Sequence, residues 1–394
     1  MKKTLLALTL ALSMTAPAFA QDFAMGEETK GLKVKISDDT DFGIRIRMQP
    51  RIDTGDTIKG ANSYDSNTDM YLRRLRLEMN GKLNKNLKYD LTLEMDKNGT
   101  AGKAESATDN SNNQTFKVLY AYIDYKLADA ANIRFGKAKL PYSRVSLTSS
   151  SKQLLIERPV STEAGKKLFN DYYQTNAMLH GSVAEGVIAY NFAVANGWEN
   201  KNSTTSNGST ADTVFTSGPL YVARVEVSPP GFVEKGKSDA WLGQGKHVTL
   251  GLSYAAQNSI RYNTASTSED RTLMGADISA HFGGLTLQGE YTALKTDYET
   301  ATDVEPKGWY VQAGYFIPGI NIEPVARYEN FDQNGNAVDK KETDTTLGFN
   351  WYGQGHSFKI GANWVHSQYD KSASGYLANA DKKDVYQVQA QMYF

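Results

Sequence analysis

Apolar and polar residues alternate with a period of two along most of this chain. In residues 385–394 the even positions are all apolar, whereas the odd positions include three glutamines. Residues 42–49, 74–80 and 87–96 repeat the alternation, with charged side chains on the polar face. Successive side chains of a β-strand point to opposite faces, so this pattern predicts strands with one apolar and one polar face.

Further segments bring the number of predicted strands to about sixteen, each close to the roughly 9 to 11 residues of a tilted membrane-spanning strand. They are centred near Ile133, Ala177, Ile188, Val225, Leu250, Ile278, Leu287, Val311, Ala326, Phe349 and Ala362. A soluble β protein also alternates, but its strands average about 5 to 6 residues. We therefore predict an all-β fold, a 16-stranded antiparallel transmembrane β-barrel.

The predicted connections alternate between long and short. Long connections, rich in Asn, Ser, Thr, Asp and Gly, cover residues 53–69, 97–115, 138–171, 199–218, 257–270, 295–306, 332–342 and 368–383. Most of the others are short turns, with one longer exception at residues 229–245. Long external loops and short periplasmic turns are typical of bacterial outer-membrane barrels, and an even number of strands leaves both termini on the periplasmic side.

The first twenty residues predict a secretory signal peptide. Two lysines precede an apolar run over residues 5–14 and the small-residue site Ala18-Phe19-Ala20. The run is too short for a transmembrane helix, which needs roughly 20 apolar residues. We therefore predict cleavage after Ala20, a short periplasmic segment at residues 21–40 and a barrel over residues 41–394.

Composition narrows the function classes. Removing Lys2 and Lys3 with the signal leaves 41 basic and 44 acidic residues, a balance that argues against a nucleic-acid partner. The absence of cysteine excludes disulfides, thiolate metal sites and cysteine nucleophiles. A mean hydropathy of −0.50 is compatible with a membrane barrel, because only every second residue of its strands must be apolar.

Motifs of catalysis or ligand binding lack the context that they need. Residues 231–238 fit the G-x-x-x-x-G-K-[ST] pattern, but it binds phosphate only between a strand and a helix, and no helical period follows here. The five histidines are never three or four residues apart, so neither a metal nor a cofactor is predicted. No signature supports a barrel protease or lipase, and we predict that the protein is not an enzyme.

The third long connection differs from the others. Residues 138–171 contain six basic and three acidic residues, together with the apolar triplet Leu154-Leu155-Ile156. Apolar side chains favour packing over exposure to water, and the free space in a barrel of this width is the lumen. We therefore predict that this loop folds inward and constricts the pore, with basic residues Lys137, Lys139, Arg144, Lys152 and Arg158. The alternative is a loop that lies on the outer surface.

Five motifs occur together over nearly the whole mature chain. They are Tyr71-Leu72-Arg73-Arg74-Leu75-Arg76-Leu77, Ala121-Tyr122-Ile123-Asp124-Tyr125, Phe135-Gly136-Lys137-Ala138-Lys139-Leu140-Pro141 with Glu157-Arg158 beyond it, Asn196-Gly197 and Gly308-Trp309-Tyr310-Val311-Gln312-Ala313-Gly314-Tyr315-Phe316. This set resembles the phosphate-selective porin O and P family. The resemblance implies a 16-stranded outer-membrane porin, embedded in lipid and typically a homotrimer, whose third loop narrows the pore.

The resemblance also implies basic residues on the pore wall. Arg45, Arg47, Arg74 and Arg76 share the polar face of the first two strands, and Glu78 is the only acid expected beside them. Other basic positions on the predicted lumen face are Arg134, Arg224 and Arg327. Acids and bases are about equal over the whole predicted lumen face, so a basic wall that faces an acidic one, without strong charge preference, is an alternative.

We expect passive diffusion of small hydrophilic solutes, with a preference for anions such as phosphate. By resemblance to other outer-membrane proteins, Tyr386 and Phe394 in the last strand are expected to form the assembly signal. Two other functions remain open. The first is a scaffold that sheathes or anchors an electron-transfer cytochrome, which a third loop outside the barrel would favour. The second is a barrel enzyme, which would act on lipid or peptide substrates.

Overall fold

The computed structural model describes residues 31–59, 63–98, 116–198, 217–261, 267–377 and 380–394. The predicted signal peptide and parts of several predicted loops lie outside these residues. Within the described residues the chain is mostly β-strand, as the alternation predicts.

Seventeen strands lie in the described part of the chain. They are β1 (Leu32–Lys35), β2 (Asp41–Lys59), β3 (Ser63–Lys82), β4 (Leu87–Asn98), β5 (Lys117–Ala128), β6 (Ala131–Lys139), β7 (Tyr173–Val183), β8 (Ile188–Ala195), β9 (Leu220–Val227), β10 (Lys246–Ile260), β11 (Glu269–Phe282), β12 (Leu285–Tyr298), β13 (Lys307–Tyr315), β14 (Ile322–Asp332), β15 (Lys341–Gln354), β16 (Phe358–Tyr369) and β17 (Lys382–Tyr393). Short helical elements are α2 (Arg144–Leu147), α3 (Val160–Leu168) and the 3-10 turn η1 (Ala184–Gly186).

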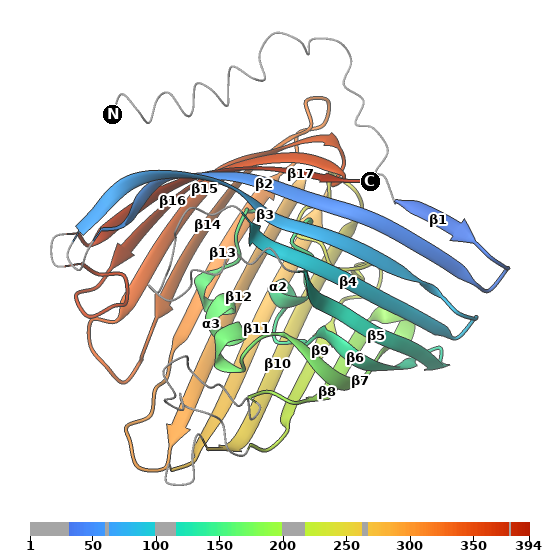
Figure 1. Ribbon diagram of the computed structural model, residues 1–394, viewed down its shortest axis with the longest axis horizontal. Helices are drawn as coiled ribbons and strands as arrows, with labels where there is room; N and C mark the ends of the chain where they lie inside the picture. The colour runs from blue at the N-terminus through green and yellow to red at the C-terminus, as the bar shows by residue number, and fades with distance from the viewer. Residues whose placement is uncertain (1–30, 60–62, 99–115, 199–216, 262–266, 378–379) are drawn as a thin grey trace.

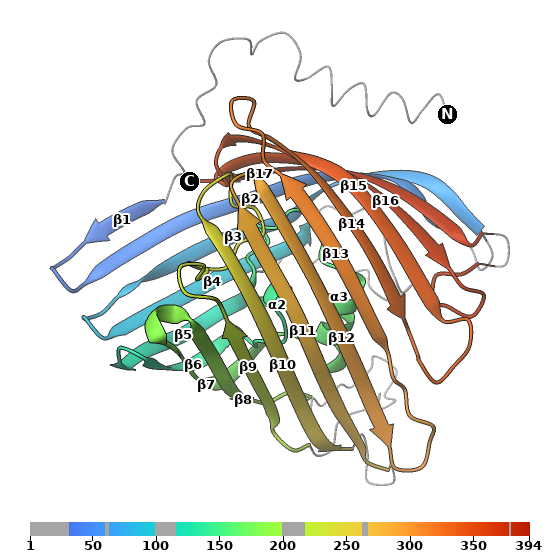
Figure 2. The same ribbon diagram turned by 180° about the vertical axis from the view of Figure 1, so that it is seen from behind.

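The strands from β2 to β17 form a closed ring. Each pairs antiparallel with the next, and β17 returns to β2 with Val385 opposite Gly55 and Tyr393 opposite Arg47. Figures 1 and 2 show the strands following one another around the barrel in chain order. The predicted 16-stranded antiparallel barrel is confirmed. Closure pairs the backbone groups between strands, which a bilayer requires because its core offers them no water.

Both ends of the described chain meet on the same edge of β2. Phe394 and Ile46 exchange two backbone hydrogen bonds, of 3.0 and 3.2 Å. The short strand β1 pairs with β2 just beyond this point, with Leu32 opposite Ile44. Residues 32–35, which belong to the segment predicted as periplasmic, thus extend the sheet past the end of β17.

Side-chain burial follows the predicted parity. On β17, Gln387, Gln389 and Gln391 are buried, whereas Met392 is 44% exposed. Aromatic residues on the opposite face, such as Trp309, are exposed as well. The apolar face therefore points outward to the lipid and the polar face lines the lumen, as in other transmembrane barrels.

One β-bulge changes which residues face the lumen. The pairing of β2 and β3 passes from Gln49 opposite Arg74 directly to Pro50 opposite Leu72, so Arg73 is an extra residue in β3. Pro50 has no N–H to donate at this point, which suits a break in the ladder. Arg73 therefore reaches the lumen beside Arg74, although strict alternation places it on the lipid face.

The connection between β6 and β7, which we call loop three, folds into the barrel. It carries α2 and α3, and Figure 1 shows both inside the ring of strands. Leu154 and Leu155 are buried in a cluster with Phe316 and Val325, as the apolar triplet predicts. The predicted inward-folded third loop is confirmed. No helix among the described residues is long and apolar enough to cross a membrane.

Candidate functional site: a basic passage beside loop three

The four arginines predicted on the first two strands lie on the lumen face of β2 and β3. Arg47, Arg74 and Arg76 are buried, and the Arg45 side chain is 28% exposed. Arg47 is directly opposite Arg76 in the strand pairing. Strand register therefore brings guanidinium groups side by side, and we call the lumen face of β2–β6 the basic wall.

Carboxylates on the same strands neutralise most of these arginines. Glu78 binds both Arg45 and Arg47, the latter with 2.7 Å between Arg47 Nη2 and Glu78 Oε1. Glu94 on β4 accepts from Arg76 Nε at 2.6 Å. The expectation that Glu78 is the only acid beside the arginines is wrong, because the β3–β4 register places Glu94 opposite Arg76.

Arg74 is the exception among the four. Its Nη1 donates to Gln49 Oε1 at 3.0 Å, and no carboxylate of the described residues lies within 4.0 Å of its guanidinium. An amide accepts a hydrogen bond without cancelling the charge. Arg74 therefore keeps its positive charge available to other groups in the lumen.

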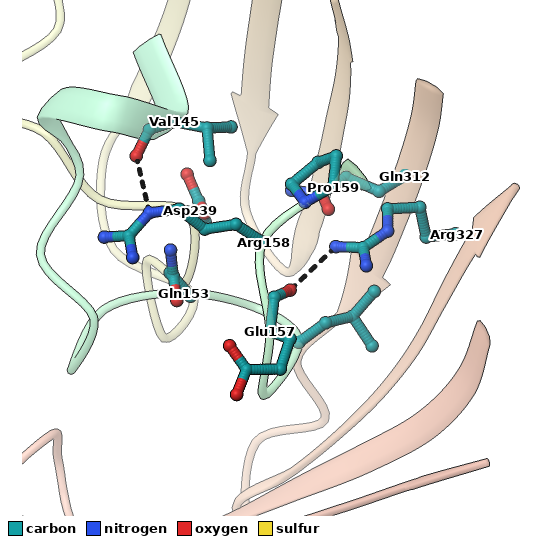
Figure 3. A pocket seen from close by; sticks show the side chains of 9 residues that line it. Val145, Gln153, Glu157, Arg158, Pro159, Asp239, Gln312 and Arg327 are labelled. Carbon is teal, nitrogen blue, oxygen red and sulfur yellow. Dashed lines mark hydrogen bonds between the residues drawn. The ribbon is translucent and has the colours of Figure 1, made fainter. Parts of the chain in front are cut away.

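Glu157 of loop three reaches the basic wall. Its carboxylate binds Arg51 on β2 and accepts from Arg73 Nε at 3.1 Å, while its backbone oxygen accepts from Arg327 on β14 at 2.9 Å. Figure 3 shows the carboxylate pointing away from Arg327. Burial alone raises the pKa of the Glu157 carboxyl, but Arg73, Arg51 and Arg74 outweigh burial and hold that pKa well below its usual range.

Carboxylates gather about half-way round the ring from the basic wall. On the lumen face of β11–β15, which we call the acidic wall, buried acids are Asp277, Glu290, Glu323, Glu329 and Asp344. Loop three packs onto this wall, with α3 against β12, β13 and β14. The first amide of α3, Val160 N, donates to Glu329 Oε2 at 2.7 Å, and Thr162 Oγ1 donates to Glu290 Oε1 at 3.2 Å.

Wall side chains also bind the backbone of loop three. Asn350 Nδ2 donates to the Leu154 oxygen at 2.7 Å, and Lys359 Nζ donates to the Gln153 oxygen at 2.8 Å. These bonds satisfy carbonyls that the loop buries without forming regular structure. Loop three is thus fixed to the far side of the lumen along several strands.

A recess of about 90 Å³ lies between loop three and the basic wall. Its lining comes from β3–β7 and loop three, and it contains no residue of β10–β17. The charged lining residues are Arg73, Arg74, Arg76, Lys117, Lys137, Arg158 and Lys166 against Glu94, Asp96, Glu163 and Asp171. The basic excess therefore faces this recess, and loop three separates it from the acidic wall.

Three buried cations beside this recess have no carboxylate partner within 4.0 Å among the described residues: Arg74, Lys139 and Arg158, which we call the basic cluster. Lys139 Nζ and Arg158 Nη2 both donate to the Thr148 oxygen, at 3.0 and 3.1 Å. Arg158 Nε donates to the Val145 oxygen, as Figure 3 shows. Carbonyl oxygens hold these cations but leave their charge uncompensated.

The other predicted basic residues have different surroundings. Arg134 binds Asp124, Arg224 binds Asp277 and Glu226, and Arg327 binds Glu329. Lys137 lines the recess. Of the residues predicted to constrict the pore, Lys137 and Arg158 line the recess, and Lys139 shares the Thr148 oxygen with Arg158 beside it.

Arg144 points instead toward the periplasmic segment at residues 229–245, between β9 and β10. Its Nη2 donates to Glu234 Oε1 at 2.5 Å and to the Ser238 oxygen at 2.6 Å, and both ionic side chains are at most 2% exposed. Asp239 N donates to the Lys152 oxygen at 2.9 Å. This segment therefore enters the barrel and meets loop three. It contains the phosphate-loop pattern, but no helix follows it.

Sequence reasoning missed Arg73 and Glu234 as members of this site, and it placed Glu94 on the lumen face without its partner Arg76. The Arg73-Arg74 doublet opposite Pro50 is a signal for the bulge. The unusual length of the segment that carries Glu234 distinguishes it from the other turns. The partnership of Glu94 with Arg76 depends on strand register, for which the sequence offers no direct signal.

A closed 16-stranded barrel with a polar lumen and an inward-folded loop defines a porin-type channel. The profile of the family described as "Phosphate-selective porin O and P" matches residues 44–394. An uncharacterized protein of Aquifex aeolicus is 40% identical over 93% of this chain and 91% of its own length, and Porin O of Pseudomonas aeruginosa is 23% identical over 92% of each.

Solved porins share the fold. An anion-selective porin from Comamonas acidovorans is similar with a TM-score of 0.60 at 15% identity, covering 90% of this chain and 100% of that porin. OmpF of Salmonella typhi gives a TM-score of 0.60 at 13% identity, covering 92% and 100%.

The chain belongs to the phosphate-selective porin O and P family. It is a channel of the bacterial outer membrane. The alternative of a cytochrome scaffold has no support, because loop three lies inside the lumen, and a channel rather than an enzyme follows from the family and the fold.

Proposed function

We propose that this porin passes small hydrophilic anions, phosphate among them, in preference to cations. The observation that carries the proposal is the basic cluster of Arg74, Lys139 and Arg158, which lacks carboxylate partners within 4.0 Å in the described part of the chain. Charges at close range in a narrow, weakly screened passage determine which ions enter it. An anion beside this cluster lowers the repulsion among its three cations.

The descriptions of the family and of one structural neighbour agree with this proposal. The family is described as phosphate-selective, and the structural neighbour from Comamonas acidovorans is an anion-selective porin. The recess adds a physical reason, because its lining has seven basic and four acidic residues.

We further propose that the mature protein begins after Ala20 and assembles in outer-membrane lipid as a homotrimer. Tyr386, near the start of the last strand, and Phe394, directly after its end, act as the assembly signal. Phe394 is 54% exposed in the closed barrel, so packing inside the barrel does not account for its ring. Transport is passive and involves no catalysis.

Phosphate block in planar bilayers tests the anion preference. Inorganic phosphate is added to channels that conduct chloride, and the concentration for half-block is measured for the wild type, Arg74→Gln and the control Lys126→Gln. Lys126 is exposed and pairs with Asp129 at a periplasmic turn. We expect block of the wild type and the control, and a half-block concentration about tenfold higher for Arg74→Gln, because a charge-assisted contact contributes about 1.5 kcal/mol. Equal block of all three contradicts the proposal.

A further inference from the structure

The aromatic ring of Tyr172 lies among the cations beside the recess. Lys166 Nζ, Arg158 Cζ and Lys139 Nζ are 5.4, 5.5 and 5.6 Å from its ring centroid. Lys139 Nζ is also 5.6 Å from the ring centroid of Tyr173. Cations within about 6 Å of an aromatic face are attracted by the ring quadrupole. One ring thus contacts two members of the basic cluster and a third cation of the recess.

The Tyr172 ring is held firmly at the end of loop three. Its backbone N donates to Asp171 Oδ1 at 2.7 Å, and its backbone oxygen accepts from Leu140 N at 2.7 Å. The ring is buried and lies 4.7 Å from the Tyr173 ring, centroid to centroid. A ring fixed in this way can fix the cations around it.

A ring and a carboxylate stabilise a cation with different consequences for the pore. Glu94 neutralises Arg76, so that this pair contributes little net charge to the lumen. Tyr172 carries no formal charge, and its quadrupole attracts Lys139 and Arg158 without cancelling theirs. Backbone carbonyls act in the same sense on these two residues.

We infer that Tyr172 is a positioning residue for anion selectivity, which holds Lys139 and Arg158 together while leaving their charge available to a passing anion. The third cation at the ring, Lys166, pairs with Glu163 at 3.8 Å. This inference rests on the proposed anion preference. It assigns a role to the aromatic ring itself rather than to the Tyr172 hydroxyl or to packing alone.

Three substitutions separate these roles. Tyr172→Leu removes the ring, Tyr172→Phe keeps the ring and removes the hydroxyl, and Phe169→Leu removes a neighbouring buried ring that has no cation contact among the described residues. Heat-modifiable migration in detergent verifies that each barrel is closed. The readouts are the concentration of inorganic phosphate for half-block and the reversal potential in a KCl gradient.

For Tyr172→Leu we expect a half-block concentration about threefold to tenfold higher than in the wild type, with a reversal potential shifted toward cations. Tyr172→Phe and Phe169→Leu are expected to resemble the wild type. If Tyr172→Leu also resembles the wild type, the ring has no such role and the inference is overturned. The inference is likewise overturned if Tyr172→Phe shows the same change as Tyr172→Leu. If the wild type shows neither phosphate block nor anion preference, the proposed function itself fails.

Discussion

Both walls of the lumen carry buried charged side chains, but the two walls differ in whether they border the recess. The basic wall borders a recess with which Arg74 and Arg158 are in direct contact. The acidic wall lies beneath loop three, whose backbone and hydroxyl donors bind Glu329 and Glu290. The charge of the whole lumen face therefore does not determine the field in the passage. The electric field that a solute meets depends on which of the two walls the solute can approach.

The two walls also differ in how their charges are balanced. Glu329 accepts hydrogen bonds from the first amide of α3 and from Arg327 Nε. Glu323 accepts a hydrogen bond from the Tyr352 hydroxyl. On the basic wall, Arg76 and Arg47 have carboxylates, whereas Arg74 does not. Near equality of acids and bases on the lumen face is thus compatible with a selective pore.

Exposing the acidic wall should produce the largest effect. Replacing residues 149–167 by a short Gly-Ser linker removes the part of loop three that covers Glu290 and Glu329, together with Arg158. We expect a several-fold larger single-channel conductance and a reversal potential that changes sign toward cations, since a wider lumen now exposes buried carboxylates. Both quantities are measured in planar bilayers.

The single substitution Arg158→Gln is the control for this replacement. It removes the same charge from the basic cluster while loop three still covers the acidic wall. Its shift in reversal potential should therefore be smaller than that of the loop replacement. A shift of equal size shows that coverage of the acidic wall contributes nothing.

Arg76 and Arg74 should differ in their effect on stability. Arg76→Gln leaves Glu94 buried, with Lys117 at 3.6 Å as its remaining ion-pair partner among the described residues, and should lower the free energy of unfolding by about 2 to 4 kcal/mol. Arg74→Gln leaves no carboxylate without its ion-pair partner, because the partner of Arg74 is the Gln49 amide, and it should lower the free energy of unfolding by less than Arg76→Gln. Urea unfolding in detergent or lipid measures both. Arg76→Gln combined with Glu94→Gln should recover most of the loss, and failure to do so contradicts the pairing.

Arg144 and Glu234 should couple loop three to the periplasmic segment. Glu234→Gln removes the carboxylate that binds the buried Arg144 guanidinium, and should destabilise this contact by about 1 to 3 kcal/mol. The resulting motion of loop three should appear as more frequent current fluctuations in open channels. Glu185→Gln, at an exposed periplasmic turn, is the matched control. Equally quiet currents in both variants contradict a coupling role.

A drop in pH should have the smallest effect. The pKa of Glu157 is held below its usual range by Arg73, Arg51 and Arg74. Its ion pairs with Arg51 and Arg73 therefore contribute their full stability at any pH above the usual pKa of a glutamate. This stability is lost only as the pH falls from the usual pKa toward the lowered one. The Glu157 ion pairs should therefore contribute no change in current fluctuations between pH 7 and about pH 5, so the wild type and Glu157→Gln should respond alike over this interval. An increase over this interval, absent from Glu157→Gln, indicates that Glu157 is protonated there.

The sequence predicts the barrel well because the bilayer imposes a simple rule. Alternation separates lipid-facing from lumen-facing residues, and it correctly places Arg47, Arg74 and Arg76 inside. The rule fails at Arg73, where a bulge shifts the parity by one residue. Local pattern does not encode which strand neighbours lie opposite each other in register, so Glu94 was not expected beside Arg76.

Contacts between distant segments were beyond the reach of local pattern. The apolar triplet beginning at Leu154 indicates that loop three packs inward, but it does not indicate which wall receives the loop. That choice depends on groups far apart in the chain, such as Val160 with Glu329 and Lys359 with the Gln153 oxygen. The cation contacts of Tyr172 likewise arise only after the loop is in place.

The reversal potential of the wild-type channel in a KCl gradient tests the central claim most directly. The claim is that the passage is bordered by the basic wall and separated from the acidic wall by loop three. We predict a potential displaced toward the chloride equilibrium value, and a smaller displacement at high ionic strength because salt screens charges. A potential near zero, or one displaced toward the potassium value, in a folded channel with loop three intact would contradict the account.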